Sequence, residues 1–113
     1  MSYAPDRGHV VWMLFNPQAG HEQGGHRPAL VLSPVSYNQR TGLAVVCPIT
    51  SSVKGYPFEV PVPEQPTMRG VILADQVKSM DWRVRGAEYL GSVPDDTITE
   101  VLERIAALLG LPT

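Results

Sequence analysis

The most informative stretch of this sequence reads Gly20-His21-Glu22-Gln23-Gly24-Gly25-His26-Arg27-Pro28, and the apolar segment Ala29-Leu30-Val31-Leu32 follows it directly. The three glycines allow backbone angles that other residues resist, whereas Pro28 fixes its own φ and biases Arg27 toward an extended conformation. The pattern predicts a mobile loop that runs into a strand, with the Arg27 side chain held where the strand begins. Loops that a rigid sheet positions often carry the functional groups of a protein.

Outward from this loop, the chain alternates short apolar runs with turn signals, which is typical of a small barrel or sandwich. Strands are expected over residues 8–15, 29–33, 43–49, 58–62, 70–74, 77–84 and 85–93. The run 43–49 is almost continuously apolar, as in a strand buried on both faces. The polar segment 37–42 reads as a turn.

The C-terminal part changes to a helical period. Apolar residues recur at spacings of three and four from Ile98 to Leu109, and this stripe is expected to pack on the sheet. Pro94 and the carboxylates after it suit a helix start, and Gly110 suits its end. The predicted fold class is therefore mainly β with a C-terminal helix, in one domain over residues 1–113.

Size and composition limit the possible functions. The chain has 113 residues, 43% of them hydrophobic, and a formal net charge of −2, so it can bury a core but has no overall field that attracts nucleic acid. No apolar run reaches the roughly 20 residues that a bilayer requires, and no export leader is recognisable. We expect a cytoplasmic protein that does not enter a membrane.

Metal and cofactor chemistry is not expected. The three histidines lack the spacing of a zinc site, and Cys47 is the only cysteine. Cys47 lies in an apolar run, where a buried, unreactive thiol is the favoured interpretation. Nucleotide-binding and nucleophile-elbow motifs are absent from the sequence.

Two polar segments remain as candidates for chemistry. If the strands 29–33 and 43–49 are antiparallel neighbours, Arg27 at the start of one faces Thr50 at the end of the other. A guanidinium and a hydroxyl form a cradle for an anionic oxygen, and Glu22 would bring a carboxylate to the same place. Such a set suffices for metal-free cleavage of RNA through its own 2′-OH. The spacing alone also allows a solvated Glu22, a surface ion pair of Arg27 and a Thr50 that merely ends its strand.

Four motifs stand in order along almost the whole chain, from about Pro5 to Gly110. They are Glu22-Gln23-x-Gly25-x-Arg27-Pro28, Pro48-Ile49-Thr50-Ser51, Lys54-Gly55-Tyr56-Pro57-Phe58-Glu59-Val60, and Ala74-Asp75-Gln76-Val77-Lys78-Ser79 with Trp82-Arg83. In these motifs and their spacing the sequence resembles the MazF/PemK family of toxin endoribonucleases, and its MazF members in particular.

The resemblance implies an SH3-like β-barrel of the MazF/CcdB/Kid type with a C-terminal helix, working as a homodimer. It implies sequence-specific cleavage of single-stranded mRNA without a metal or another cofactor, leaving a 2′,3′-cyclic phosphate and a 5′-hydroxyl. The result in the cell would be growth arrest, which a small MazE-like antitoxin would prevent by covering the RNA groove.

The resemblance also implies roles for individual residues. Arg27 and Thr50 match the main catalytic residues of the family, and Glu22 matches a loop glutamate to which a base role has been assigned in some members. Because a guanidinium is effectively never deprotonated in proteins, we expect Arg27 to stabilise charge rather than to act as a base. The candidates for RNA contact are His26, Asn38, Gln39, Ser51, Lys54, Tyr56, Asp75, Gln76 and Lys78.

Two alternatives to an active nuclease remain. A CcdB-like toxin would share the barrel and the dimer but would bind DNA gyrase without cutting RNA, and it would not need the set of Glu22, Arg27 and Thr50. A silent remnant would only bind antitoxin. In the nuclease, a local positive groove for RNA and for an acidic antitoxin tail could come from Arg27, Lys54, Lys78, Arg83 and Arg85.

Overall fold

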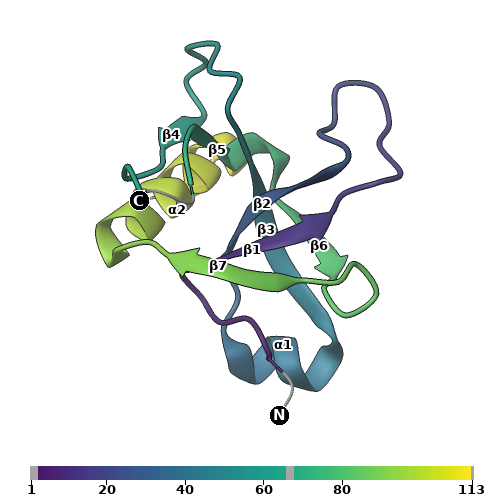
Figure 1. The fold of residues 1–113 in the computed structure, drawn as a ribbon. Helices are drawn as coiled ribbons and strands as arrows, with labels where there is room; N and C mark the ends of the chain where they lie inside the picture. Colours follow the sequence, from purple (N-terminus) through teal and green to yellow (C-terminus); the bar gives the residue numbers. More distant parts are fainter. Residues whose placement is uncertain (1–2, 66–67, 113) are drawn as a thin grey trace.

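The computed structural model describes residues 3–65 and 68–112. The described part forms a curved, barrel-like antiparallel sheet with a helix at each of two ends (Figure 1). In chain order the elements are β1 (His9–Leu14), β2 (His26–Val31), α1 (Val35–Thr41), β3 (Leu43–Thr50), β4 (Glu59–Pro61), β5 (Val71–Leu73), the 3-10 turn η1 (Ala74–Gln76), β6 (Lys78–Asp81), β7 (Glu88–Ser92) and α2 (Asp95–Leu109).

The sheet confirms the predicted fold class. Its strand order is β4-β5-β3-β2-β1-β7, with β6 beside the first half of β3, and among the described residues this pairing does not close into a ring. The predicted antiparallel pairing of β2 with β3 is present, with Ala29 opposite Pro48 and Leu30 opposite Cys47. β2 begins three residues earlier than expected, because His26 and Arg27 pair with the end of β1.

The central strands are buried on both faces, as the apolar run 43–49 predicted. Successive side chains of a strand point to opposite faces, so β2 and β3 contribute to two cores. Leu30 and Cys47 belong to the core beneath α2, whereas Val31 and Val46 belong to the core on the other face. The two central strands are thereby fixed in register from both sides.

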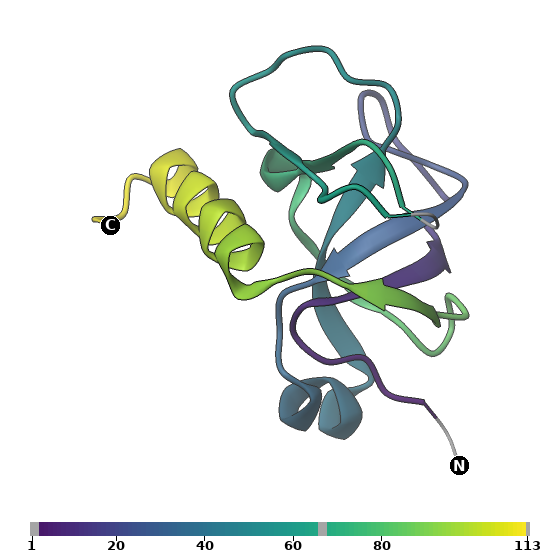
Figure 2. The same cartoon turned by 60° about the vertical axis from the view of Figure 1, so that its left-hand side comes forward.

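The C-terminal helix is present where the period predicted it. α2 begins after Pro94 and ends at Gly110, whose φ of 72° supplies the left-handed conformation of the C-cap. Its first half packs on the sheet through Ile98 and Val101 (Figure 2). The expectation that the whole stripe packs there is wrong for the second half, since Leu108 and Leu109 are exposed.

The segment 37–42, predicted as a turn, is mostly the short helix α1, which ends at Gly42. The helix is held by Asn38, which is completely buried. Its side chain accepts a hydrogen bond from Ser33 Oγ at 2.5 Å and donates to the carbonyl of Pro5 at 2.9 Å. The Trp82 indole N–H donates to the Asn38 carbonyl at 2.9 Å. These contacts come from distant parts of the chain and replace the apolar stripe that α1 lacks.

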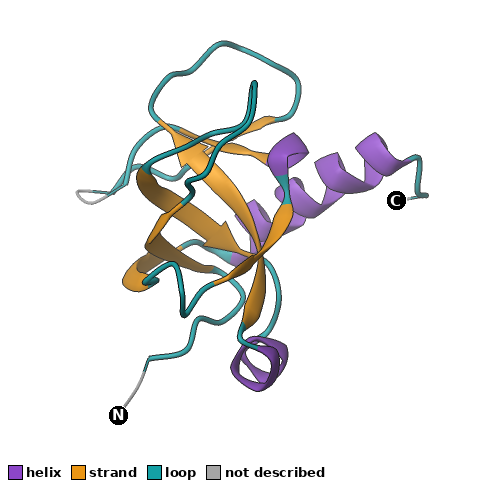
Figure 3. Cartoon of the chain, turned by 90° about the vertical axis from the view of Figure 1, so that its right-hand side faces the viewer, coloured by secondary structure: helices purple, strands orange, loops and turns teal. Residues whose placement is uncertain are grey.

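Two long loops rise from the same end of the sheet (Figures 1 and 3). The first, residues 15–25, joins β1 to β2 and contains the glycine-rich stretch. The second, residues 51–58, follows β3. Of the helices in the described part of the chain, none is long and apolar enough to cross a membrane.

Candidate functional site

A cleft of about 610 Å³ opens between the two loops and η1. Its walls carry cationic, anionic and hydroxyl groups from three separate segments of the chain. The lining residues are His21, Gln23, Arg27, Thr50, Ser52, Lys54, Tyr56, Glu59, Leu73, Asp75 and Gln76. The cleft therefore contains both Arg27 and Thr50, the two residues that the strand register was expected to bring together.

The backbone register explains this meeting. β2 and β3 pair with Ala29 opposite Pro48, and two further steps along the same antiparallel register lead to Arg27 and Thr50. Both residues stand where their strands meet the two long loops. The juxtaposition follows from strand pairing, which is a rigid way to position two functional groups.

Arg27 is anchored by one of its donors and keeps the others available. Its Nε donates to the carbonyl oxygen of Gly24 at 2.8 Å, which fixes the plane of the guanidinium. The ion pairs among the described residues join Lys78 to Glu22 and Arg104 to Glu100, so Arg27 has no carboxylate partner within this part of the chain. The two terminal amino groups of the fork can therefore bind an anion in the cleft.

Thr50 is nearly buried, with 9% of its surface exposed. Its Oγ1 accepts a hydrogen bond from the Ser52 N–H at 3.1 Å, which leaves the hydroxyl hydrogen to be donated elsewhere. Gly70 lies against the Thr50 backbone, and a Cβ at Gly70 would be 2.0 Å from the Thr50 carbonyl oxygen. The end of β3 is thus held in place by a neighbour that has to be glycine.

A buried carboxylate shapes the second loop. Glu59 is 8% exposed and accepts hydrogen bonds from the N–H groups of Lys54, at 3.1 Å, and Gly55, at 2.9 Å. Arg104 of α2 also donates to the carbonyl of Pro57 in this loop. These contacts hold the exposed side chains of Lys54 and Tyr56 at the mouth of the cleft.

Glu22 lies beside the cleft rather than in it. Its side chain lines an adjoining hollow of about 200 Å³ together with Lys78, and its Oε2 is 4.0 Å from the Lys78 ammonium. Its Oε1 accepts the Ala19 N–H at 2.9 Å. Gln23, Asp75 and Gln76 line both spaces and form the wall between them.

The other predicted contact residues are scattered. Ser51 is exposed and does not line the cleft, and His26 is exposed and stacks on Trp12 at a ring-centroid distance of 5.9 Å. The hypothesis that Asn38 contacts a base is wrong, because Asn38 is buried in the scaffold of α1. Gln39 is on the same helix and does not line the cleft.

The predicted positive groove is also smaller than expected. Arg83 stacks over the Trp82 ring and donates to the Gln39 carbonyl, and Arg85 donates to the carbonyls of Leu14 and Asn16. Both guanidiniums are thus engaged in the scaffold. Of the five basic residues predicted for the groove, Arg27 and Lys54 line the cleft itself.

Sequence reasoning missed several residues that build the site. Gly70, Glu59 and Gln23 were given no role in the site, because their importance depends on how the loops fold. Cys47 is completely buried, and its burial raises the pKa of the thiol to about 12, with a smaller contribution from the charge of Asp75. In residues 3–65 and 68–112, no group of three or more His, Cys, Asp or Glu side chains could hold a metal ion.

The fold and the cleft together describe a small β protein in which an arginine and a threonine line one cleft between two loops. Comparison with known proteins agrees with this description. Residues 6–109 match the family described as the PemK-like, MazF-like toxin of type II toxin–antitoxin systems. The chain belongs to this family.

Individual relatives are similar over nearly their whole length. The endoribonuclease toxin MazF of Escherichia coli K12 is 48% identical over 108 residues, which is 96% of each chain. A crystal structure of MazF from Deinococcus radiodurans superposes with a TM-score of 0.93 at 56% identity, covering 97% of this chain and 100% of the other. MazF in a MazE–MazF complex from the same organism gives a TM-score of 0.88 at 56% identity, covering 98% and 100%.

Proposed function

We propose that this protein is a MazF-type endoribonuclease toxin of a type II toxin–antitoxin system, and that it cleaves single-stranded mRNA at a specific short sequence. The observation that carries the proposal is the meeting of Arg27 and Thr50 in one cleft, with no carboxylate bound to the Arg27 guanidinium among the described residues. Family membership and the name endoribonuclease, which the E. coli relative carries, support the same activity.

The proposed reaction uses the 2′-hydroxyl of the RNA as the nucleophile. The 2′ oxygen attacks the adjacent phosphorus and loses its proton to a base, while the bond from phosphorus to the 5′ oxygen breaks. The departing 5′ oxygen takes up a proton from water, so the products are a 2′,3′-cyclic phosphate and a 5′-hydroxyl. Negative charge accumulates on the non-bridging oxygens in the transition state, and preorganised donors aimed at those oxygens lower the barrier.

The two residues of the cleft suit this task. Arg27 supplies a permanent positive charge and two free amino groups, so it stabilises the phosphorane and can donate to the departing 5′ oxygen. The Thr50 hydroxyl donates to a non-bridging oxygen. The positive charge comes from the protein itself, so the proposed chemistry requires no metal or other cofactor.

Glu22 is the proposed base. The wall that separates its hollow from the cleft is formed by exposed or half-buried side chains, so an RNA strand that lies across both spaces would bring a 2′-hydroxyl toward the carboxylate. Glu22 is itself exposed, and a carboxylate oxygen within reach of the 2′-hydroxyl can accept its proton.

Base recognition is proposed for the second loop. Tyr56 is 60% exposed at the cleft mouth and offers an aromatic face on which an unpaired base can stack. Lys54 offers a charge for the RNA backbone, and Asp75 offers an acceptor for base edges. His26, Ser51 and Lys78 do not line the cleft itself and are secondary candidates for contact with the RNA.

The protein's partners are proposed from the same features. The MazE–MazF complexes of the relatives support a MazE-like antitoxin for this toxin. A homodimer is supported by the exposed leucines of α2, among them Leu102 and Leu108, and by an apolar hollow of about 540 Å³ between α1, the sheet and α2. We place the toxin in the cytoplasm, where its mRNA substrate is.

The test is cleavage of a labelled RNA by the purified protein in EDTA. Discrete cuts at one short sequence, with cyclic-phosphate ends, are the expected result. Arg27→Ala should nearly abolish cleavage, whereas Arg40→Ala, an exposed arginine on α1, serves as the matched control and should cut normally. Intact RNA together with arrested DNA gyrase would establish the CcdB-like alternative. Wild-type rates from a folded Arg27→Ala protein would refute the mechanism.

A further inference from the structure

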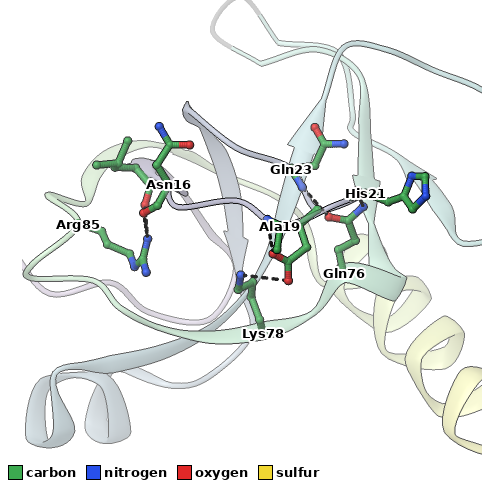
Figure 4. Close-up of polar contacts among 9 residues, drawn as sticks. Asn16, Ala19, His21, Gln23, Gln76, Lys78 and Arg85 are labelled. Carbon is green, nitrogen blue, oxygen red and sulfur yellow. Dashed lines mark hydrogen bonds and ion pairs between the residues drawn. The ribbon is translucent and has the colours of Figure 1, made fainter.

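The glycine-rich loop is fastened to the rest of the molecule by Gln76. The Gln23 N–H donates to Gln76 Oε1 at 3.0 Å, and Gln76 Nε2 donates to the His21 carbonyl at 3.4 Å. Figure 4 shows the Gln76 side chain reaching from η1 to the loop between these two residues. One amide side chain thus satisfies a donor and an acceptor of the same loop.

The loop backbone that Gln76 holds is close in sequence to Arg27. Gly24 follows Gln23, and its carbonyl oxygen is the acceptor that holds Arg27 Nε at 2.8 Å. One peptide lies between the Gln23 N–H, which Gln76 holds, and the Gly24 carbonyl, so a displacement of Gln23 is passed on through Gly24 to the group that fixes the guanidinium plane. The chain of contacts runs from Gln76 through the loop backbone to the residue proposed to stabilise the transition state.

The tip of the loop is otherwise restrained mainly by contacts within itself. The Glu22 N–H donates to the Ala19 carbonyl at 3.1 Å, and the Ala19 N–H donates to Glu22 Oε1 at 2.9 Å. Glu22 and Lys78 are 4.0 Å apart and partly exposed, and such surface pairs contribute little. Asn16 holds the other end of the loop. Its Oδ1 accepts the Gly25 N–H at 2.8 Å, in the same peptide as the Gly24 carbonyl, and its own carbonyl accepts from Arg85 at 2.7 Å (Figure 4).

We propose that Gln76 is a positioning residue that fixes the glycine-rich loop and, through the Gly24 carbonyl, the orientation of the Arg27 guanidinium. The proposal rests on the function proposed above and refines it, because it gives Gln76 a role other than the base contact that the sequence suggested. Gln76 is half-buried, and the loop already takes one hydrogen of its Nε2 and one lone pair of its Oε1, which fixes the orientation of the amide.

The two roles predict different kinetic results. A positioning residue acts on the chemical step, so its loss lowers the maximal single-turnover rate and leaves the half-saturating RNA concentration nearly unchanged. A base-reading residue acts on binding and choice of sequence, so its loss weakens RNA binding and relaxes the cleaved sequence.

The main variant is Gln76→Met, which keeps the length of the side chain and removes both hydrogen bonds. The expected result is a maximal rate lower by about 10- to 100-fold, the cost typical of misplacing a catalytic group by about 1 Å, with the same cleavage sites. Gln65→Met is the matched control. Gln65 donates to the Ser92 carbonyl at 3.0 Å, outside the cleft, so its loss should leave the rate unchanged.

Gln76→Glu separates the two hydrogen bonds and provides a second variant should the methionine protein fail to fold. A carboxylate still accepts from the Gln23 N–H but cannot donate to the His21 carbonyl, so the rate should fall less than in Gln76→Met. The effect must also depend on Arg27. In an Arg27→Lys background, which lacks the Nε donor, adding Gln76→Met should cause little further loss.

Hydrogen exchange of the Gln23 amide tests the hydrogen bond between Gln76 and the loop without a measurement of activity. This amide should exchange at least about tenfold faster in Gln76→Met than in wild type, because its acceptor is gone. Unchanged exchange and an unchanged rate would overturn the inference, as would altered cleavage sites with a normal maximal rate. A wild-type protein that does not cut RNA would refute the proposed function instead. Faster exchange of the Gln23 amide in Gln76→Met would still show that Gln76 holds the loop.

Discussion

Arg27 and Thr50 illustrate how little freedom the reacting groups have. The guanidinium plane is held by the Gly24 carbonyl, and the Thr50 hydroxyl is oriented by the Ser52 N–H. Each side chain forms one hydrogen bond with the backbone and keeps at least one donor for a ligand. Such preorganisation means that no side chain has to be reoriented at the moment of reaction, which is the main source of electrostatic catalysis.

The hydroxyl of Thr50 can be tested by substitutions of nearly the same shape. Thr50→Val should lower the cleavage rate by about 10²–10³-fold, the cost typical of losing one preorganised donor. Thr50→Ser keeps the donor and should retain part of the activity. Single-turnover rates on one short RNA measure both effects. If Thr50→Val cut RNA at the wild-type rate, the hydroxyl would have no part in the reaction.

The placement of Arg27 opposite Thr50 could be predicted from the sequence, because it depends only on two apolar runs pairing as antiparallel strands. The contribution of Gln76 could not be predicted from the sequence. Its contacts depend on the path of a glycine-rich loop, and nothing in the local pattern fixes that path. Glu22 shows the same limit, since the loop carries it into the hollow beside the cleft.

At the scale of elements, the end of β3 depends on a close approach by the residue before β5. Gly70 has a φ of 113°, and its α-carbon faces the Thr50 carbonyl with no room for a Cβ. This contact positions the strand end from the side opposite to β2. The geometry of the site is therefore set by three elements and not by the two loops alone.

Gly70→Ala should impair both folding and cleavage. The positive φ alone costs about 1–3 kcal/mol for a residue with a side chain, and the added methyl would displace Thr50. Gly86→Ala is the matched control, because Gly86 has a φ of 65° with nothing within 4 Å of the added atom. Denaturant unfolding and cleavage rates compare the two. Equal cleavage rates for the two variants would contradict the role given to Gly70.

The elements differ in how well the sequence predicted them. The strands and α2 carry apolar periods that reflect the faces they bury, so their positions could be predicted. α1 has no such period. It is stabilised by Asn38 and Trp82, whose partners are remote in sequence, and by Asp6, which accepts the Val35 N–H at 2.8 Å. Polar segments of this kind look like turns until the rest of the fold is known.

The start of α1 should make stability depend on pH. The hydrogen bond from the Val35 N–H lowers the pKa of the Asp6 carboxyl below its ordinary value of 3.8. A carboxyl with a lowered folded-state pKa stabilises the fold above its unfolded pKa, and this contribution is lost as the pH falls through the folded value. Asp6→Asn should therefore reduce stability by about 0.3–1 kcal/mol near neutral pH.

Thermal or urea unfolding of both proteins across the acidic range measures this dependence. The difference between wild type and Asp6→Asn should shrink as the pH falls below 3.8. A difference that stays constant over this range would contradict a role for the charge of Asp6 in holding the start of α1. The cleft is not involved, so cleavage at neutral pH should be unaffected.

At the scale of the whole molecule, the chain combines a net charge of −2 with a cleft that contains Arg27 and Lys54. An overall negative charge does not attract nucleic acid, so binding depends on the local field of the cleft. Exposed apolar residues on α2 provide a second kind of surface. The molecule thus has one face suited to anions and another suited to a protein partner.

An acidic antitoxin tail that enters the cleft should bind in a salt-dependent way. Its affinity should fall at least about tenfold between about 50 and 500 mM NaCl, because ions screen contacts between exposed charges. Calorimetry with a peptide of the antitoxin tail measures this dependence. Lys54→Ala should make the affinity change less steeply with salt concentration. An affinity that does not change with salt would indicate that an apolar surface, such as that of α2, carries the interaction.

The strand β3 pairs with β2 along its middle, with β6 at its first half and with β5 at its end. Two of these three partners are translated after it, and the core that covers it is completed only by α2. During synthesis on the ribosome, β2 and β3 therefore emerge before the strands and the helix that hold the end of β3 in place. We expect the complete cleft to form only when most of the polypeptide has left the ribosome.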